Sequence, residues 1–255
     1  MSEAPILDFF TVLTPYFDGP FAVVAAVAIV AAAFRAFTGF GANVIWGPVL
    51  MVFYGPVDMV AIMAVAACAT MPQIAIPAAK DADWPTMWVM FAAVIVAVPV
   101  GVVTLLHADP LIVKKAFGVF ILICALILAS GWVYRGTHSR WATAGTGALA
   151  GWIGGFAGVG GPVLVIYFMA APGEARVQRA NNTISVSLIA PVTLAALIWQ
   201  GAITPDAWIR GALLLIPMAF GQWIGLRLFR IAPVKLFRRV SLGLMMAIGI
   251  SVLLA

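Results

Sequence analysis

The sequence predicts an all-α polytopic membrane protein with about eight transmembrane segments in two four-segment repeats, each beginning with a broken or re-entrant helix. Hydrophobic residues make up 64% of the 255 residues and charged residues 9%, against roughly half and a quarter in soluble domains. The mean hydropathy of +1.13 points the same way. So few charges could not cover the surface of a soluble globule, and that class is excluded.

Residues 1–19 are predicted to form an interfacial segment ahead of the first span. No basic residue occurs before Arg35. A secretory signal needs a positively charged start, so we do not expect this segment to be cleaved. Its apolar and aromatic side chains are typical of a chain that lies along a membrane surface.

Apolar runs of membrane-spanning length follow along the rest of the chain, separated by charged residues and proline. They cover residues 20–54, 59–79, 85–106, 116–134, 141–171, 181–200, 207–226 and 240–255. One straight span takes about 20 residues. Six of the runs therefore suit one crossing each, whereas the runs at 20–54 and 141–171 are too long.

Glycine interrupts both long runs. Residues 39–43 read Gly-Phe-Gly-Ala-Asn, and residues 158–162 read Gly-Val-Gly-Gly-Pro. Glycine weakens a helix, and proline removes one of its hydrogen bonds. We therefore predict a helix break inside each long run.

The two breaks are related by an internal duplication. An offset of 119 residues carries Phe37 onto Phe156, Gly39 onto Gly158, Gly41 onto Gly160 and Pro72 onto Pro191. A shared offset across separated motifs indicates two repeats, which we predict at 20–134 and 141–255.

The Lys and Arg bias of the loops predicts the orientation of the chain. The basic segment at 227–239 and the one at 176–179 should be cytoplasmic, which leaves both chain termini outside. If each broken run crosses once, the repeats are parallel. If each is a re-entrant hairpin, the repeats are inverted and the loops at 114–115 and 135–140 change sides. Charge counting leaves both topologies open.

The paired breaks predict a binding site near the bilayer midplane. Backbone that leaves a helix at membrane depth must be buried or line a wet cavity, and paired broken helices are typical of transporter sites. The exposed N-terminus of a half-helix favours an anion. Alternatively, the glycines only allow tight helix packing. The predicted substrate-binding residues are Arg35, Gly39, Gly41, Asn43, Gly158, Gly160, Gly161, Asn181 and Asn182.

The polar side chains in this set each have a second interpretation. Arg35 lies deep in an uncharged run, where it could coordinate an anion or extend to the interface. Asn43 could donate to the substrate or cap a helix. Asn181 and Asn182 could contact the substrate or bond between helices.

The glycine motifs resemble those of the sulfite exporter TauE/SafE family, also called toluene sulfonate uptake permeases. The similar stretches are Phe37 to Asn43 with Gly47-Pro48, and Phe156 to Pro162. The resemblance covers essentially the whole chain. It implies a membrane carrier for small anions such as sulfite, sulfoacetate and other sulfonates. The chain departs from the usual three glycines at Ala42, Asn43 and Pro162, which bears on substrate identity.

We therefore expect a secondary transporter, acting as an exporter, in the bacterial cytoplasmic membrane. The alternatives are an anion channel, or an uptake permease for a small carboxylate or sulfonate. An enzyme is not expected, because no nucleophile and base pattern occurs. No cofactor or metal is expected either, since Cys68 and Cys124 lie in apolar runs. The expected partners are the small anion and the lipid bilayer; no nucleic acid is expected, and a homodimer is one option for assembly.

The coupling mechanism can be argued from the placement of the carboxylates. No Asp or Glu lies in the middle of an apolar run, so a proton relay has no obvious members. A membrane potential of about 100 mV, inside negative, drives each exported negative charge by roughly 2.3 kcal/mol. Efflux driven by the potential is therefore our first hypothesis.

Overall fold

The computed structural model describes residues 14–38, 41–130, 139–168 and 174–228, and the secondary structure of these residues is entirely helical. The elements are η1 (Thr14–Tyr16), α2 (Gly19–Thr38), α3 (Ala42–Ala78), α4 (Trp84–His107), α5 (Pro110–Ser130), α6 (Arg140–Ala157), α7 (Gly161–Phe168), α8 (Ala175–Trp199), α9 (Pro205–Leu213) and α10 (Leu215–Leu228). Within this part of the chain, five helical stretches are long and apolar enough to cross a membrane. The prediction of an all-α membrane protein is confirmed.

Both long apolar runs are broken where glycine predicted it. Gly41 directly precedes α3 and has a φ of +89°, and Gly158 ends α6 with a φ of +72°. Both values fall in the left-handed region, where a Cβ atom causes strain. The sequence therefore ends one helix and begins the next within a few residues at each site.

A further break divides α3, at a position that sequence alone marked only as the end of a run. Gly55 has a φ of 79° and a ψ of 169°, outside the helical region. Residues 42–54 thus form one short helix, and residues 56–78 form a longer one. Pro56 follows directly and suits the first turn of this second helix, since its missing N–H group is not needed there.

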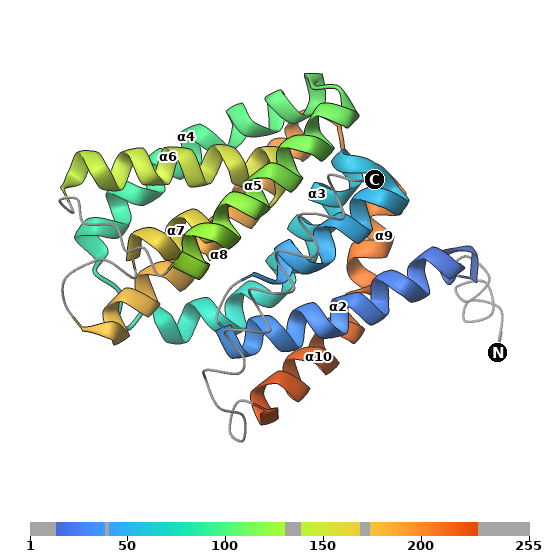
Figure 1. Cartoon of the computed structure of the whole chain (residues 1–255), viewed down its shortest axis with the longest axis horizontal. Coiled ribbons are helices and arrows are strands. Elements are labelled where there is room, and N and C mark those ends of the chain that lie inside the picture. Colours follow the sequence, from blue (N-terminus) through green and yellow to red (C-terminus); the bar gives the residue numbers. More distant parts are fainter. Residues whose placement is uncertain (1–13, 39–40, 131–138, 169–173, 229–255) are drawn as a thin grey trace, which may run out of the picture.

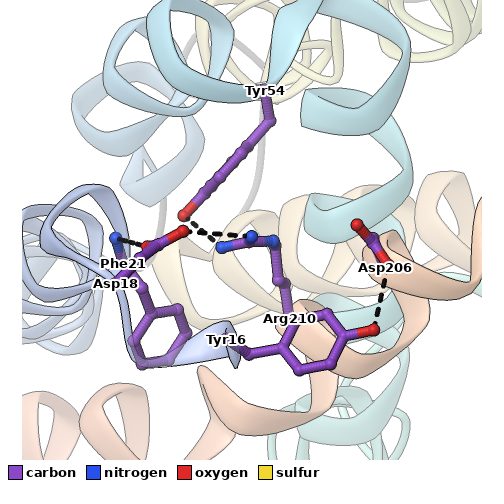
Figure 2. A network of polar contacts seen from close by, with 6 residues as sticks. All are labelled: Tyr16, Asp18, Phe21, Tyr54, Asp206 and Arg210. Atoms are coloured by element: carbon purple, nitrogen blue, oxygen red, sulfur yellow. Dashed lines mark hydrogen bonds and ion pairs between the residues drawn. The ribbon is translucent and has the colours of Figure 1, made fainter. Parts of the chain in front are cut away.

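The first broken run returns to the side of the molecule from which it starts. Arg210 donates to Asp18 Oδ2 at 3.2 Å and to Tyr54 Oη at 2.9 Å. Asp18 directly precedes α2, and Tyr54 ends the short helix over 42–54. Figure 2 shows both side chains pointing at this one guanidinium group.

The second broken run folds back in the same way. Thr143 in the first turn of α6 and Tyr167 near the end of α7 are joined by a buried hydrogen bond of 2.8 Å between their hydroxyl groups. The two halves of this run therefore lie side by side, with the break around Gly158 at the far tip.

Two further polar contacts mark the two ends of the molecule. At one end, Thr204 before α9 donates to Asp58 at 3.2 Å; we call this the Asp58 end. At the other, Arg176 at the start of α8 pairs with Asp81 after α3 at 2.8 Å; we call this the Arg176 end. Residues 56–78 run from the Asp58 end to the Arg176 end, and α8 runs back, so the two helices are antiparallel.

Close helix packing depends on glycine at two interfaces. α4 packs along α6, and α10 packs along α2, on opposite sides of α3 (Figure 1). A Cβ atom on Gly155 of α6 would lie 2.2 Å from the Val98 carbonyl oxygen, and one on Gly225 of α10 would lie 2.3 Å from the Ala33 carbonyl oxygen. Small residues let helix backbones approach this closely in a membrane.

Charge stabilises the start of α2. A hydrogen bond from the Phe21 backbone N–H group, together with the Arg210 guanidinium, lowers the pKa of Asp18 below its usual range. The stability from these contacts is therefore present at neutral pH and is lost in acid, as the pH falls through the lowered pKa. Tyr16 donates to Asp206 at 2.9 Å, and this bond raises the pKa of the phenol (Figure 2).

Helix boundaries differ from the apolar runs where charged residues lie inside a helix. α8 begins at Ala175, whereas the apolar run begins at 181. The difference arises because the first turns of the helix carry Arg176 and Arg179, which an apolar run excludes. α5 begins at Pro110 rather than at 116, ahead of two lysines. Charge ends an apolar run, but an exposed helix end can carry it at little cost.

Candidate functional site

A cavity lies between the two helix breaks. It has a volume of about 70 Å³, and its walls come from the end of α2, the start and middle of α3, the α6–α7 break and the middle of α8. One water needs roughly 10–15 Å³ of such space. The cavity therefore has room for an anion of only a few heavy atoms.

Two helix N-termini face this cavity. Ala42 and Asn43 begin α3, Gly161 and Pro162 begin α7, and all four residues line the walls. The N–H groups of a first helical turn have no acceptor within the helix, and that end of a helix carries a partial positive charge. Pro162 has no N–H group, so donors at α7 must come from its neighbours. The pairing of these two ends favours an anionic ligand.

Arg35 supplies a full positive charge at the same place. Its side chain is half-buried and lines the cavity. Among the residues that the structure describes, the Arg35 guanidinium forms no hydrogen bond and no ion pair. A charge left unpaired inside a membrane protein is costly unless a partner compensates it. An anion in the cavity would be such a partner.

Asn43 joins the two breaks to each other. Its Nδ2 donates to the Gly158 carbonyl oxygen at 2.7 Å, and its Oδ1 accepts from Trp46 Nε1 at 3.1 Å. The interpretation of Asn43 as a helix cap is wrong, because Gly41 precedes α3 and no side chain caps it. The carboxamide retains one N–H bond that could reach a ligand.

The predicted glycines lie around the cavity as far as they are described. Gly41, Gly158, Gly160 and Gly161 all line it, whereas Gly39 lies outside the described residues. Gly160 also has a packing role, since a Cβ atom there would lie 2.2 Å from the Ala150 carbonyl oxygen. The packing and binding interpretations therefore apply to the same segment.

The two adjacent asparagines of α8 do not line this cavity. Asn181 accepts a hydrogen bond of 2.8 Å from the Asp83 backbone N–H group and thereby fixes the turn before α4. The Oδ1 atom of Asn182 is buried and has no hydrogen-bond partner among the described residues. Contact between either side chain and a substrate remains a prediction.

Two hydroxyl groups at the cavity were not among the predicted site residues. Ser187 and Thr193 of α8 both line the cavity and are 5% and 2% exposed. Their oxygen atoms are buried, and among the described residues neither has a hydrogen-bond partner. Buried polar groups are normally satisfied, so both hydroxyls are free to bond to a ligand. The sequence signal was weak: Thr193 lies two residues after Pro191, which the 119-residue offset pairs with Pro72.

The described residues that line the cavity include no carboxylate. In the described ranges, no group of three or more His, Cys, Asp or Glu residues could hold a metal ion. The chemistry of the site is therefore that of helix N-termini, hydroxyls, one amide and one guanidinium. All of these can bond to the oxygens of an anion.

Comparison with known proteins gives one match. The model of a protein family described as sulfite exporter TauE/SafE matches residues 24–252. Neither the curated proteins nor the solved structures contain a match. The matched stretch includes both helix breaks and every residue named above as lining the cavity.

Proposed function

Because this chain belongs to the sulfite exporter TauE/SafE family, we propose that it exports small sulfur-containing anions through the cavity between the two helix breaks. Sulfite, sulfoacetate and other short sulfonates are the substrate class. The observation that carries the proposal is the meeting, at one cavity, of two helix N-termini and Arg35, which has no partner among the described residues. Each would bind the oxygens of a sulfite or sulfonate group.

The size of the cavity bears on the substrate. A volume of about 70 Å³ suits sulfite or the sulfonate end of sulfoacetate, whereas an aromatic sulfonate would need the walls to move apart. The hydroxyls of Ser187 and Thr193 add donors for further oxygens. We propose a site made of Arg35, the α3 and α7 starts and these two hydroxyls.

The arrangement of the helices supports two inverted repeats. Each broken run folds back, and the runs approach the cavity from opposite ends of the molecule. In such a topology the first turns of α5, with Lys114 and Lys115, lie outside, and the start of α6 at Arg140 lies inside. Rocking of one repeat against the other would open the site to either side of the membrane in turn. Cysteines placed at these two helix starts should therefore react with an impermeant reagent from opposite sides.

Efflux driven by the membrane potential fits the described lining of the cavity, which includes no carboxylate. Purified protein in liposomes should accumulate sulfoacetate when a potassium diffusion potential makes the interior positive. A pH gradient at zero potential should drive no accumulation. Uphill uptake driven by that pH gradient would contradict the proposal. Counterflow of labelled sulfoacetate distinguishes a carrier from the alternative, an anion channel.

Replacing Thr193 with valine should separate binding from folding. Valine has nearly the shape of threonine, and the change removes a buried hydroxyl that has no partner among the described residues. The ligand-free protein should keep or gain thermal stability, because an unsatisfied buried polar group costs about 1–3 kcal/mol. Anion binding should weaken by about tenfold, since one hydrogen bond to a charged group is lost.

Thr183→Val is the matched control for this experiment. Thr183 lies on the same helix, but its hydroxyl donates to the Arg179 carbonyl oxygen, and the residue does not line the cavity between the two breaks. Its replacement should leave sulfite binding at that cavity at wild-type strength. If Thr193→Val lowers stability and leaves anion binding unchanged, the hydroxyl has a structural role and the proposed site loses one donor.

A further inference from the structure

A second and larger cavity opens at the Arg176 end of the molecule. Its volume is about 600 Å³, and residues of α2, α3, α8 and α10 line it. Among the described residues, three arginines (Arg35, Arg176 and Arg179) and one carboxylate (Asp81) contribute to its walls. The balance of charge is therefore positive by two. We call it the outer cavity, and the one between the breaks the inner cavity.

Arg35 belongs to both cavities. It lines the inner cavity together with Gly41 and Gly160, and the outer cavity together with Gln73 and Gln222. One guanidinium group therefore lies at the boundary between a wide positive space and a narrow one. An anion in either space could bond to it.

The outer arginines are available to a ligand to different degrees. Arg176 pairs with Asp81 at 2.8 Å, but its side chain is 75% exposed. Arg179 is exposed, and among the described residues its side chain has no ion pair. Gln73, Thr183 and Gln222 add neutral hydrogen-bonding groups to the same walls. The outer cavity thus carries charged groups and hydrogen-bond donors beside its apolar lining residues.

We propose that the outer cavity is a second anion-binding site, an entry vestibule that passes small sulfur-containing anions to the inner cavity through Arg35. The proposal rests on the proposed function of the inner cavity. The Lys and Arg bias assigns this end to the cytoplasm, which is the side from which an exporter takes its substrate. A positive cleft raises the local concentration of anions, and weak binding at successive sites lets an ion move onward.

The paired carboxylate makes the vestibule weaker than it could be. Asp81 competes with the anion for Arg176, so binding there stays modest and release toward Arg35 is favoured. An anionic lipid headgroup presents the same oxygens as a sulfonate and could occupy the same arginines. The free anion and the lipid headgroup can be distinguished by titrations with and without a charged lipid.

Titration calorimetry on the protein in phosphatidylcholine nanodiscs tests the proposal. Sulfoacetate and sulfite should each bind to the wild type in a tight step and a weak step. Arg179→Gln should weaken the weak step by about threefold to tenfold and leave the tight step unchanged. Asp81→Asn should strengthen the weak step, because it frees Arg176. High salt should abolish both differences, since it screens exposed charges.

Arg140→Gln is the matched control, because Arg140 is exposed and lines neither cavity. It should leave both binding steps unchanged. The vestibule proposal is overturned if Arg179→Gln behaves like Arg140→Gln. It is also overturned if the wild type shows no weak step with either anion, while phosphatidylglycerol added to the nanodiscs binds in a way that depends on Arg179.

The same titrations distinguish this failure from failure of the inner site. Thr193→Val should weaken only the tight step. If it has no effect while Arg179→Gln weakens the other step, the vestibule is supported and the inner site is wrong. If neither sulfoacetate nor sulfite binds to the wild type, both proposals are wrong.

Discussion

Arg35→Gln is expected to weaken the binding of sulfite, sulfoacetate and small carboxylates by a similar factor of about 10 to 100. Among the described residues that line the inner cavity, Arg35 alone carries a full charge, and the described structure gives its guanidinium no partner. A lost charge is not selective among anions, so the ranking of the three ligands should remain. Equilibrium binding constants for each anion measure the effect.

Transport should fall together with binding, because Arg35 lines both cavities. Arg227→Gln is the control: Arg227 stacks on Trp223 at 3.7 Å from the ring centre and lines neither cavity. It removes the same charge and should leave anion binding within about twofold of wild type. Wild-type binding by Arg35→Gln would move the substrate site away from the inner cavity.

The helix breaks and the charge at Arg35 could be predicted from the sequence because both are local. Glycine and proline weaken a helix wherever they occur in an apolar run, and an arginine among apolar residues is equally visible. The family resemblance depends on the same short motifs. The φ of +89° at Gly41 and the membership in the TauE/SafE family both confirm these inferences.

The fold-back of each broken run could not be predicted, because hydropathy gives the length of a segment but not its direction. The direction follows from tertiary contacts such as Asp18 and Tyr54 with Arg210. These residues lie far apart in sequence: Asp18 and Arg210 are both charges near span ends, but nothing in the sequence indicates that they pair. The break within α3 at Gly55 was not predicted for a related reason, since one glycine beside a proline is as typical of a loop as of a kink in a helix.

The roles of the polar side chains also depended on tertiary structure. Successive residues of a helix point about 100° apart, so adjacent Asn181 and Asn182 cannot face the same neighbour. Asn181 bonds to the turn before α4, whereas Ser187 and Thr193, less conspicuous in the sequence, reach the inner cavity. Composition marks a helix as polar but does not indicate which of its polar groups lack a partner.

Gly160→Ala and Gly161→Ala should affect different properties, although the two positions are adjacent and each change adds one methyl group. The first should lower stability, and the second should lower anion binding. At Gly160 the new Cβ atom would lie 2.2 Å from the Ala150 carbonyl oxygen and 2.9 Å from Ile189 Cδ1. The backbone must move to relieve this contact, so we expect a loss of about 3 kcal/mol of stability. Thermal unfolding in detergent and size-exclusion chromatography should report a much less stable protein.

At Gly161 the new methyl group would meet only Val186 Cγ2, at 3.7 Å, which is an ordinary contact. Both Gly161 and Val186 line the inner cavity, so the methyl group would reduce its volume without strain. Gly161→Ala should therefore unfold at about the wild-type temperature and bind sulfoacetate less tightly, with a smaller effect on sulfite. The size dependence arises because a cavity of about 70 Å³ has little space to lose. Unchanged binding of both anions by this folded variant would show that the substrate does not sit between the two breaks.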